Sequence, residues 1–289
     1  MIPAQFDYTR PASIEEALRI LARRDPGTKV ISGGMSLLPL LKLRLAEVDT
    51  LVDIGRLPEL HGIREGADGG VIIGSAVTYR EVLESALVAE RAPLITEVVN
   101  DIGDVQVRNR GTLGGSLAHA DPASDIPAAV LALDAMLALR SVEGQRAGPV
   151  DGFFRGPFET AIKPTELVIE VRIPKAPAGA GAAYRSLTQP ASGYSMVGVA
   201  AVVARSGGAI SHARVALTGV GEVAYRAKAV EAALLGSDGS ADAIAAAAEH
   251  AADGQQVNGD IHADAEYRAA MAVVFTRRAI EAALVRAAS

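Results

Sequence analysis

The chain has 289 residues, enough for one large domain and a smaller one, and 49% of them are apolar. Its formal net charge is −6 with no basic block, which argues against nucleic acid as the main partner. It contains no cysteine, so it can hold neither a disulfide nor a thiolate-bound iron–sulfur cluster. We expect no signal peptide, no membrane-spanning helix and a cytoplasmic location, because no suitable apolar stretch is present.

The elements predicted in chain order alternate between helix and strand. Ser13 is a suitable N-cap for an amphipathic helix over 13–24, with Glu16 at the capping-box position. Further helices are expected at 37–44, 78–83, 87–99, 227–235, 240–252 and 264–287, and strands at 28–31, 51–54, 71–75, 166–173, 194–204 and 213–218. An apolar run covers 126–139. A linker-like segment rich in Ala, Gly and Pro, 175–181, predicts a boundary between domains 1–176 and 177–289.

Two glycine-containing segments are candidates for a ligand site. The first is Ser32-Gly33-Gly34-Met35-Ser36, where the glycines permit positive φ and close backbone approach. Successive N–H groups in such a loop can converge on an anion. The hydroxyls of Ser32 and Ser36 can add donors, and the helix that follows directs its positive end the same way.

The second segment is Thr112-Leu113-Gly114-Gly115-Ser116, in which Thr112 and Ser116 flank the glycine pair as the serines do in the first. One glycine pair is more often an ordinary turn than a phosphate site. Two pairs with matching hydroxyl flanks predict two phosphate groups and hence a dinucleotide. Neither segment is a Walker A loop, because no Lys-Ser or Lys-Thr follows the glycines.

Four stretches in order carry a resemblance to a known family. They are IPAQFDY at 2–8, the first glycine segment, RNRGTLGGS at 108–116 and ADPASDIP at 120–127. As an ordered set they resemble the medium, flavin-binding subunit of the xanthine dehydrogenase and aerobic carbon monoxide dehydrogenase family. The likeness extends over essentially the whole chain, to 276–278 near its end.

The resemblance implies an α+β fold. Residues 1–176 would form an α/β FAD-binding domain of the vanillyl-alcohol-oxidase (PCMH) type with two subdomains, and 177–289 a small domain of antiparallel sheet and helices. FAD would lie extended between the two subdomains. Its pyrophosphate would be held by Gly33, Gly34 and Ser36 together with Thr112, Gly114 and Gly115. Asp125 would hydrogen-bond the adenosine part, Asp121 would lie beside that site, and Tyr194 would lie near the isoalloxazine ring.

The resemblance also implies an oxidoreductase subunit of a heterotrimer, without catalytic residues or metal ligands of its own. Substrate would be oxidised at a molybdopterin centre on a large partner chain. Electrons would cross 2Fe–2S clusters on a small partner chain, reach FAD here and leave to NAD or a quinone. A quinone acceptor would place the complex at the inner face of the membrane. The missing cysteines agree with this division of labour.

Three positions depart from the pattern of that family. Met35 stands where related sequences carry a polar residue, and Ser116 stands where Asn is frequent. Ser186 stands where many members carry a Lys, so a flavin-tuning role of that Lys is in doubt here, although Arg185 is adjacent.

Several motifs invite other interpretations. His119 with Asp121 and Asp125 could suggest a metal site, but no second His lies near and we expect a structural role. Ser116, His119 and Asp121 are not a catalytic triad, because triads are assembled in space and no nucleophile elbow is present. Segment 219–224 imitates a Rossmann fingerprint, yet no strand is expected after the following helix, so we predict a turn. Arg108 and Arg110 either offset pyrophosphate charge or lie in solvent.

Two other functions remain open from the residues alone. A self-sufficient flavin oxidoreductase would need a catalytic base and a closed pocket within this chain, for which we find no convincing candidate. A non-redox nucleotide-binding assembly factor would hold no stable flavin.

Overall fold

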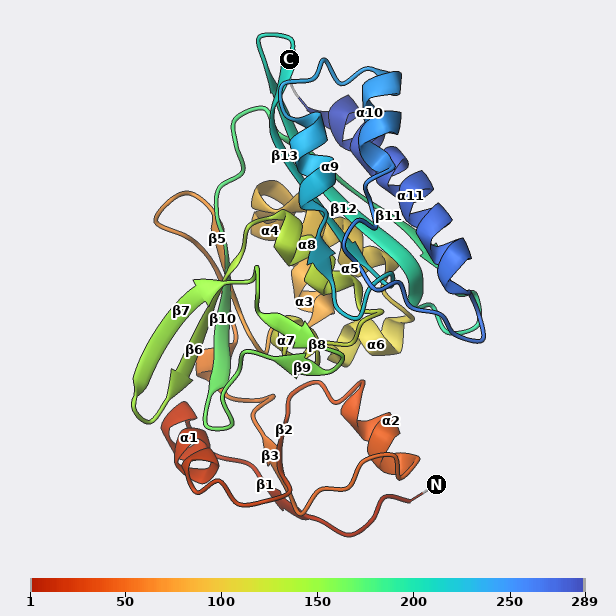
Figure 1. The fold of residues 1–289 in the computed structure, drawn as a ribbon. Coiled ribbons are helices and arrows are strands. Elements are labelled where there is room, and N and C mark those ends of the chain that lie inside the picture. Colours follow the sequence, from red (N-terminus) through yellow and green to blue (C-terminus); the bar gives the residue numbers. More distant parts are fainter. Residues whose placement is uncertain (1, 288–289) are drawn as a thin grey trace.

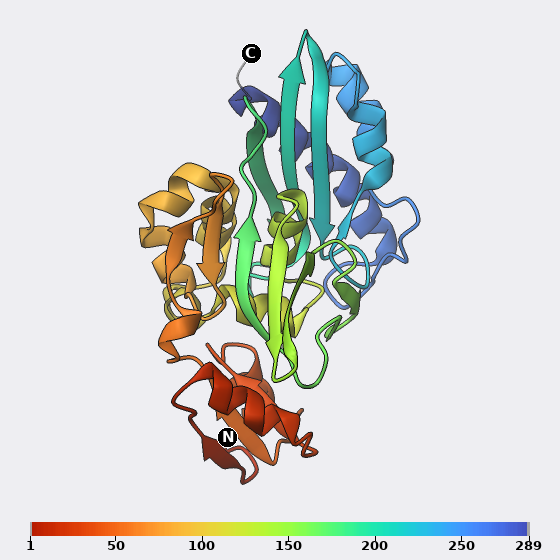
Figure 2. The same cartoon turned by 90° about the vertical axis from the view of Figure 1, so that its left-hand side faces the viewer.

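Three main β-sheets organise residues 2–287, which the computed structural model describes (Figure 1). Met1 and residues 288–289, at the ends of the two predicted domains, lie outside the described residues. The N-terminal sheet belongs to a small subdomain below the rest of the molecule in both views (Figure 2). Within the described part of the chain, no helix is long and apolar enough to cross a membrane.

The N-terminal subdomain is built on a parallel sheet. Its strands lie in the order β1 (Asp7–Thr9), β3 (Thr50–Asp53) and β2 (Thr28–Ile31). Helix α1 (Ile14–Ala22) begins as predicted, because the Ser13 hydroxyl accepts a hydrogen bond from the Glu16 amide at 3.2 Å. The short helix α2 (Leu37–Lys42) follows the first glycine segment.

The central part has an antiparallel sheet covered by helices. The strands lie in the order β4 (Ile63–Glu65), β5 (Val71–Gly74), β10 (Leu167–Ile173), β6 (Met136–Ser141) and β7 (Gly144–Pro149). The helices are α3 (Tyr79–Glu84), α4 (Ala86–Arg91), α5 (Pro93–Asp101), α6 (Val105–Arg110), α7 (Leu113–His119) and α8 (Asp125–Ala132). A two-stranded ribbon, β8 (Phe154–Gly156) with β9 (Glu159–Thr160), lies beside them.

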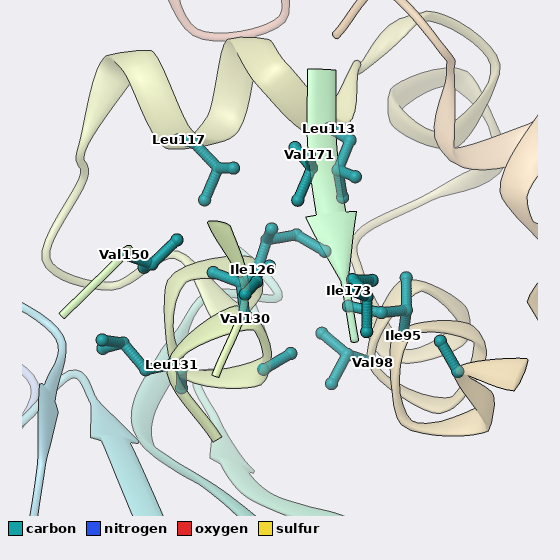
Figure 3. Close-up of a cluster of buried hydrophobic side chains, with 14 of the residues drawn as sticks. Ile95, Val98, Leu113, Leu117, Ile126, Val130, Leu131, Val150, Val171 and Ile173 are labelled. Carbon is teal, nitrogen blue, oxygen red and sulfur yellow. The ribbon is translucent and has the colours of Figure 1, made fainter. Parts of the chain in front are cut away.

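Helix α8 lies at the centre of the molecule, and every one of its residues is buried. Ile126 and Val130 pack with Val98 of α5 and Ile173 of β10 in the main core (Figure 3). A helix that is apolar on all sides is stable only when protein surrounds it. The apolar run predicted at 126–139 is therefore divided, with its first half in α8 and its second half mainly in β6.

The C-terminal sheet is antiparallel and covered on both faces. Its strands lie in the order β11 (Gly181–Thr188), β12 (Ser195–Ser206), β13 (Ala209–Thr218) and β14 (Tyr225–Arg226). Ala200 and Val202 face the core of α8, while Val199 and Val203 face the other helices. Those helices are α9 (Lys228–Leu234), α10 (Ala241–Ala248) and α11 (Ala265–Arg286). The main core thus continues across residues 176 and 177.

Two predicted elements are wrong in their limits. The helix expected over 87–99 is interrupted at Ala92, because Pro93 disfavours helical backbone in the residue before it and starts a new helix itself. The linker expected over 175–181 ends in a packed strand. A side chain on Gly181 would lie 2.0 Å from the Ala283 carbonyl oxygen of α11, so this glycine permits close packing of strand and helix. Segment 219–224 contains no helix or strand, as predicted.

Candidate functional site

The two glycine segments lie against each other although about eighty residues of chain separate them. The Thr112 hydroxyl donates to the Ser32 hydroxyl at 3.2 Å. A Cβ atom added to Gly33 would lie 2.1 Å from the Arg110 carbonyl oxygen, so only glycine allows the two backbones to approach this closely. The N-terminal subdomain and the central part therefore meet at the predicted site.

The first glycine segment presents unpaired backbone donors. Among residues 2–287, no acceptor receives a hydrogen bond from the amides of residues 33 to 36. Gly34 has a φ of +75°, a conformation that favours glycine. The Ser36 side chain does not cap helix α2, so its hydroxyl is available as a further donor. Successive free amides of this kind can form a cradle that suits an anion.

The second glycine segment is built differently, and the expectation of a second loop with free amides is wrong. Its residues form the first turn of α7, with Thr112 as N-cap. The amides of Leu113 and Gly114 donate to the carbonyl oxygens of Val77 and Ser75, at 3.0 and 2.9 Å. The Gly115 amide donates to the Thr112 hydroxyl at 3.2 Å. In the described chain, the Thr112 amide is the one member of this segment without an acceptor.

A cleft opens where the two segments meet. It is lined by backbone and hydroxyl groups of Ser32, Gly33, Gly55, Thr78 and Thr112, and by Tyr8, Arg10, Asp53, Arg56, Ala76 and Arg110. Its one carboxylate, Asp53, accepts hydrogen bonds from the Tyr8 hydroxyl at 2.6 Å and from the Gly55 amide at 2.9 Å. The hydrogen bond to Asp53 raises the pKa of Tyr8, so this hydroxyl stays protonated.

A second hollow lies between the central part and the C-terminal sheet. Asp121 and Tyr194 both line it, together with Phe158 and the buried Arg268. The Arg268 guanidinium donates to the carbonyl oxygens of Met196 and Gly219 at 2.6 and 2.7 Å, and pairs with Asp260 at 2.5 Å. Tyr194 is 47% exposed, and Phe158 is 59% exposed. This hollow therefore has aromatic walls and a rigid polar frame.

Asp125 lies behind that hollow, and its carboxylate is already hydrogen-bonded to other side chains of the protein. Its Oδ1 accepts hydrogen bonds from Tyr184 and from Ser195, the latter at 2.5 Å. Burial raises the pKa of Asp125 to about 6. The resemblance assigns Asp121 and Asp125 to adenosine and Tyr194 to isoalloxazine, yet Asp121 and Tyr194 share one hollow. The assignment of these residues to the two ends of FAD stays a prediction.

Most of the other residues considered in the sequence contact the protein itself. The His119 ring packs against Phe158, 5.1 Å between centroids, and burial lowers the pKa of this imidazole. Arg108 donates to the Ile102 and Gly103 carbonyl oxygens, whereas Arg110 lines the cleft. Arg185 is paired with Glu97 at 2.9 Å.

Ser116 and Ser186 are two of the positions that depart from the family pattern. The Ser116 and Ser124 hydroxyls lie 2.7 Å apart. Ser186 lies within β11, opposite Gly198.

Sequence reasoning missed the cleft residues outside the glycine segments. Tyr8 lies within the motif at 2–8, but Arg10, Asp53 and Arg56 belong to no periodic pattern or motif of characteristic spacing. They reach the cleft because β1 and β3 are neighbours in the parallel sheet, and each of these residues lies at or just beyond the end of its strand.

Two known families match parts of this chain. Residues 4–176 match the family described as FAD binding domain in molybdopterin dehydrogenase, and residues 182–283 match the CO dehydrogenase flavoprotein C-terminal domain. The chain is 40% identical over 288 residues to the carbon monoxide dehydrogenase medium chain of Hydrogenophaga pseudoflava, covering 100% of both chains. It is 38% identical to the 6-hydroxypseudooxynicotine dehydrogenase complex subunit alpha of Paenarthrobacter nicotinovorans, covering 99% of this chain and 97% of the relative.

A solved structure agrees over the full length. Carbon monoxide dehydrogenase from Hydrogenophaga pseudoflava, in a form which lacks the Mo-pyranopterin moiety of the molybdenum cofactor, superposes with a TM-score of 0.97. The identity is 42%, and 100% of each chain is covered. The observed α+β architecture, with an FAD-binding part followed by an antiparallel sheet and helices, is thus the one that the resemblance implied.

Proposed function

This chain belongs to the family of FAD-binding medium subunits of molybdenum hydroxylases, and from that membership we propose that it relays electrons within a larger complex. Substrate oxidation takes place at molybdopterin on a large partner subunit, and 2Fe–2S clusters on a small partner subunit deliver the electrons. FAD held by this chain would supply the redox chemistry that links these clusters to an external acceptor, NAD or a quinone. The absence of cysteine from this chain supports the assignment of the clusters to another subunit.

The four free amides of residues 33 to 36 are the observation that carries this proposal. With the Ser32 hydroxyl and the free Thr112 amide, they would hold the FAD pyrophosphate in the cleft. Gly114, Gly115 and Ser116 would shape the wall of the site rather than donate to the anion.

The second hollow suits the flavin end of the cofactor. Tyr194 and Asp121 would lie beside the isoalloxazine, because this hollow has aromatic walls and lies apart from the anion cradle. Asp125 would position Ser195 and Tyr184 behind it. The chain itself contributes binding and orientation, and we assign no proton transfer to it.

We also propose that the protein is cytoplasmic. We further propose that the chain divides near residues 176 and 177 into two parts that share one hydrophobic core. Because Ala200, Val202 and Ala216 belong to the main core, residues 177–289 expressed alone should expose that apolar face. Proteolysis of the full chain should therefore leave the two parts associated. Rapid separation of two independently folded fragments would contradict the shared core.

The visible absorption spectrum of the purified full chain tests the cofactor. A flavin spectrum, with FAD identified after release, supports the proposal, and iron–sulfur absorbance in addition would show that the partners co-purified. A colourless protein that also binds no added FAD contradicts it and favours the assembly-factor function. Turnover of a substrate by this chain alone would instead support a self-sufficient oxidoreductase.

A matched pair of variants assigns the binding to the cradle. Gly34→Asp places a carboxylate among the free amides at a φ of +75° and should abolish FAD binding. Gly207→Asp is the control, because Gly207 has a φ of +60° and a side chain there would meet no atom within 4 Å. Equal FAD binding by the two variants would contradict the placement of the pyrophosphate.

A further inference from the structure

We propose that Arg10, Arg56 and Arg110 form a cationic clamp that selects ligands bearing a pyrophosphate, an inference that rests on the proposed FAD site. All three side chains line the cleft beside the first glycine segment. All three are exposed at the surface, so they are charged without a large cost of desolvation. They are specificity-determining residues for the anionic part of the cofactor.

These three arginines combine a place in the cleft with the absence of a carboxylate partner; Arg23, Arg24, Arg155 and Arg278 also have no such partner in the described chain, but none of them lines the cleft. Most arginines in the described chain form ion pairs or donate to carbonyl oxygens, as Arg146 does with Glu166 at 2.7 Å. Within residues 2–287, the side chains of the three clamp arginines take part in no ion pair or hydrogen bond. Asp53, the single acidic residue in the cleft, already accepts from Tyr8 and Gly55. The three guanidinium groups therefore keep all their donors for a ligand.

The charges of the two hollows differ in the way that this assignment requires. Three guanidinium groups and one occupied carboxylate line the cleft. The second hollow contains Asp121, Asp260 and Arg268. The Arg268 guanidinium already pairs with Asp260 and donates to two carbonyl oxygens. A pyrophosphate with two negative charges is attracted to the first and repelled from the second.

The three arginines of the clamp come from both sides of the boundary between the N-terminal subdomain and the central part. Arg10 follows β1 and Arg56 follows β3 of the N-terminal subdomain, whereas Arg110 ends α6 of the central part. A pyrophosphate that contacts both sides joins the two subdomains. Guanidinium groups suit this role because they donate two parallel hydrogen bonds to phosphate oxygens.

The test is a titration of the flavin-free full chain with FAD, followed by quenching of flavin fluorescence. Arg10→Gln, Arg56→Gln and Arg110→Gln should each weaken FAD binding by about tenfold to a hundredfold, as expected for loss of hydrogen bonds to a charged group. Arg23→Gln is the control, because Arg23 is exposed, lies in the same subdomain outside the cleft and loses the same charge. Circular dichroism and the thermal midpoint verify that each variant is folded.

Competition with ADP and adenosine separates a clamp from a general defect of the fold. ADP should displace FAD far better than adenosine from the unmodified chain, and this preference should shrink in the three variants and flatten with rising salt. Unchanged preferences and affinities in all three variants would overturn the clamp while leaving the FAD proposal intact. Failure of the unmodified chain to bind FAD would overturn both.

Discussion

The two glycine segments have nearly the same sequence pattern, but the fold uses them in opposite ways. In residues 32–36 the glycines leave consecutive amides without acceptors at the mouth of a cleft. In residues 112–116 the amides donate to the Ser75 and Val77 carbonyls and to the Thr112 hydroxyl. A glycine pair can thus be required either by a ligand or by a neighbouring strand. Only the partners of its amides distinguish the two cases.

The physical reason lies in what surrounds each segment. The first segment projects from the end of a three-stranded sheet, so solvent or a ligand must satisfy its donors. The second lies against the turn that follows β5, and the next helix, α8, is buried in the main core. A change in the first segment should therefore alter ligand binding, and a change in the second should alter folding.

The largest expected effect concerns Asp125, behind the second hollow. Burial raises its pKa from 3.8 to about 6, so between these values the folded protein holds a proton that the unfolded chain releases. The free energy of unfolding should therefore fall by up to about 3 kcal/mol as pH rises from 4 towards 7. Asp125→Asn, whose amide oxygen can accept from both hydroxyls, should remove this slope in urea unfolding curves. An identical slope in the variant would contradict this assignment.

Gly114→Ala tests whether the second segment serves packing. The new Cβ would lie 2.5 Å from the Ser75 Cβ and 2.7 Å from the Ser75 carbonyl oxygen. Such overpacking should lower the free energy of unfolding by about 2 kcal/mol, even without FAD. Urea denaturation of the flavin-free protein measures this loss. Unchanged stability combined with lost FAD binding would show instead that this glycine contacts the ligand.

Thr112→Ala acts on the contact between the segments. It removes the N-cap of α7 and the hydrogen bond to Ser32, and should lower the free energy of unfolding by about 1 kcal/mol. Thr112→Ser keeps both hydrogen bonds and should restore most of this stability. If the serine variant were as unstable as the alanine variant, the capping hydroxyl would not be the cause.

Ser36→Ala gives the smallest change in stability and sharpens the contrast. Its hydroxyl caps no helix, so the free energy of unfolding should change by less than about 0.5 kcal/mol. FAD affinity should nevertheless fall by about 0.5–1.5 kcal/mol if the hydroxyl donates to the pyrophosphate. Calorimetric titration measures the affinity. A larger loss of stability than of affinity would place Ser36 in the fold and not in the site.

Much of the fold could be predicted because local signals were strong. Ser13 and Glu16 define the start of α1, and the alternation of Val171 and Ile173 with charged neighbours indicates strand β10. The helix break at Pro93 also has a local cause that the apolar pattern concealed. By contrast, β7 is largely exposed and has no apolar alternation, so it could not be found in this way.

The sequence by itself determined the family, the cofactor class and the two segments at the site, since ordered motifs and glycine pairs are properties of the chain. Tertiary structure alone decided which amides are free, because hydrogen-bond partners such as Ser75 and Val77 come from a turn more than thirty residues earlier in the chain. It also brought Arg10 and Arg56 to the same cleft as Arg110. Distances along the chain carry no information about such contacts, which arise from sheet order and from burial of α8.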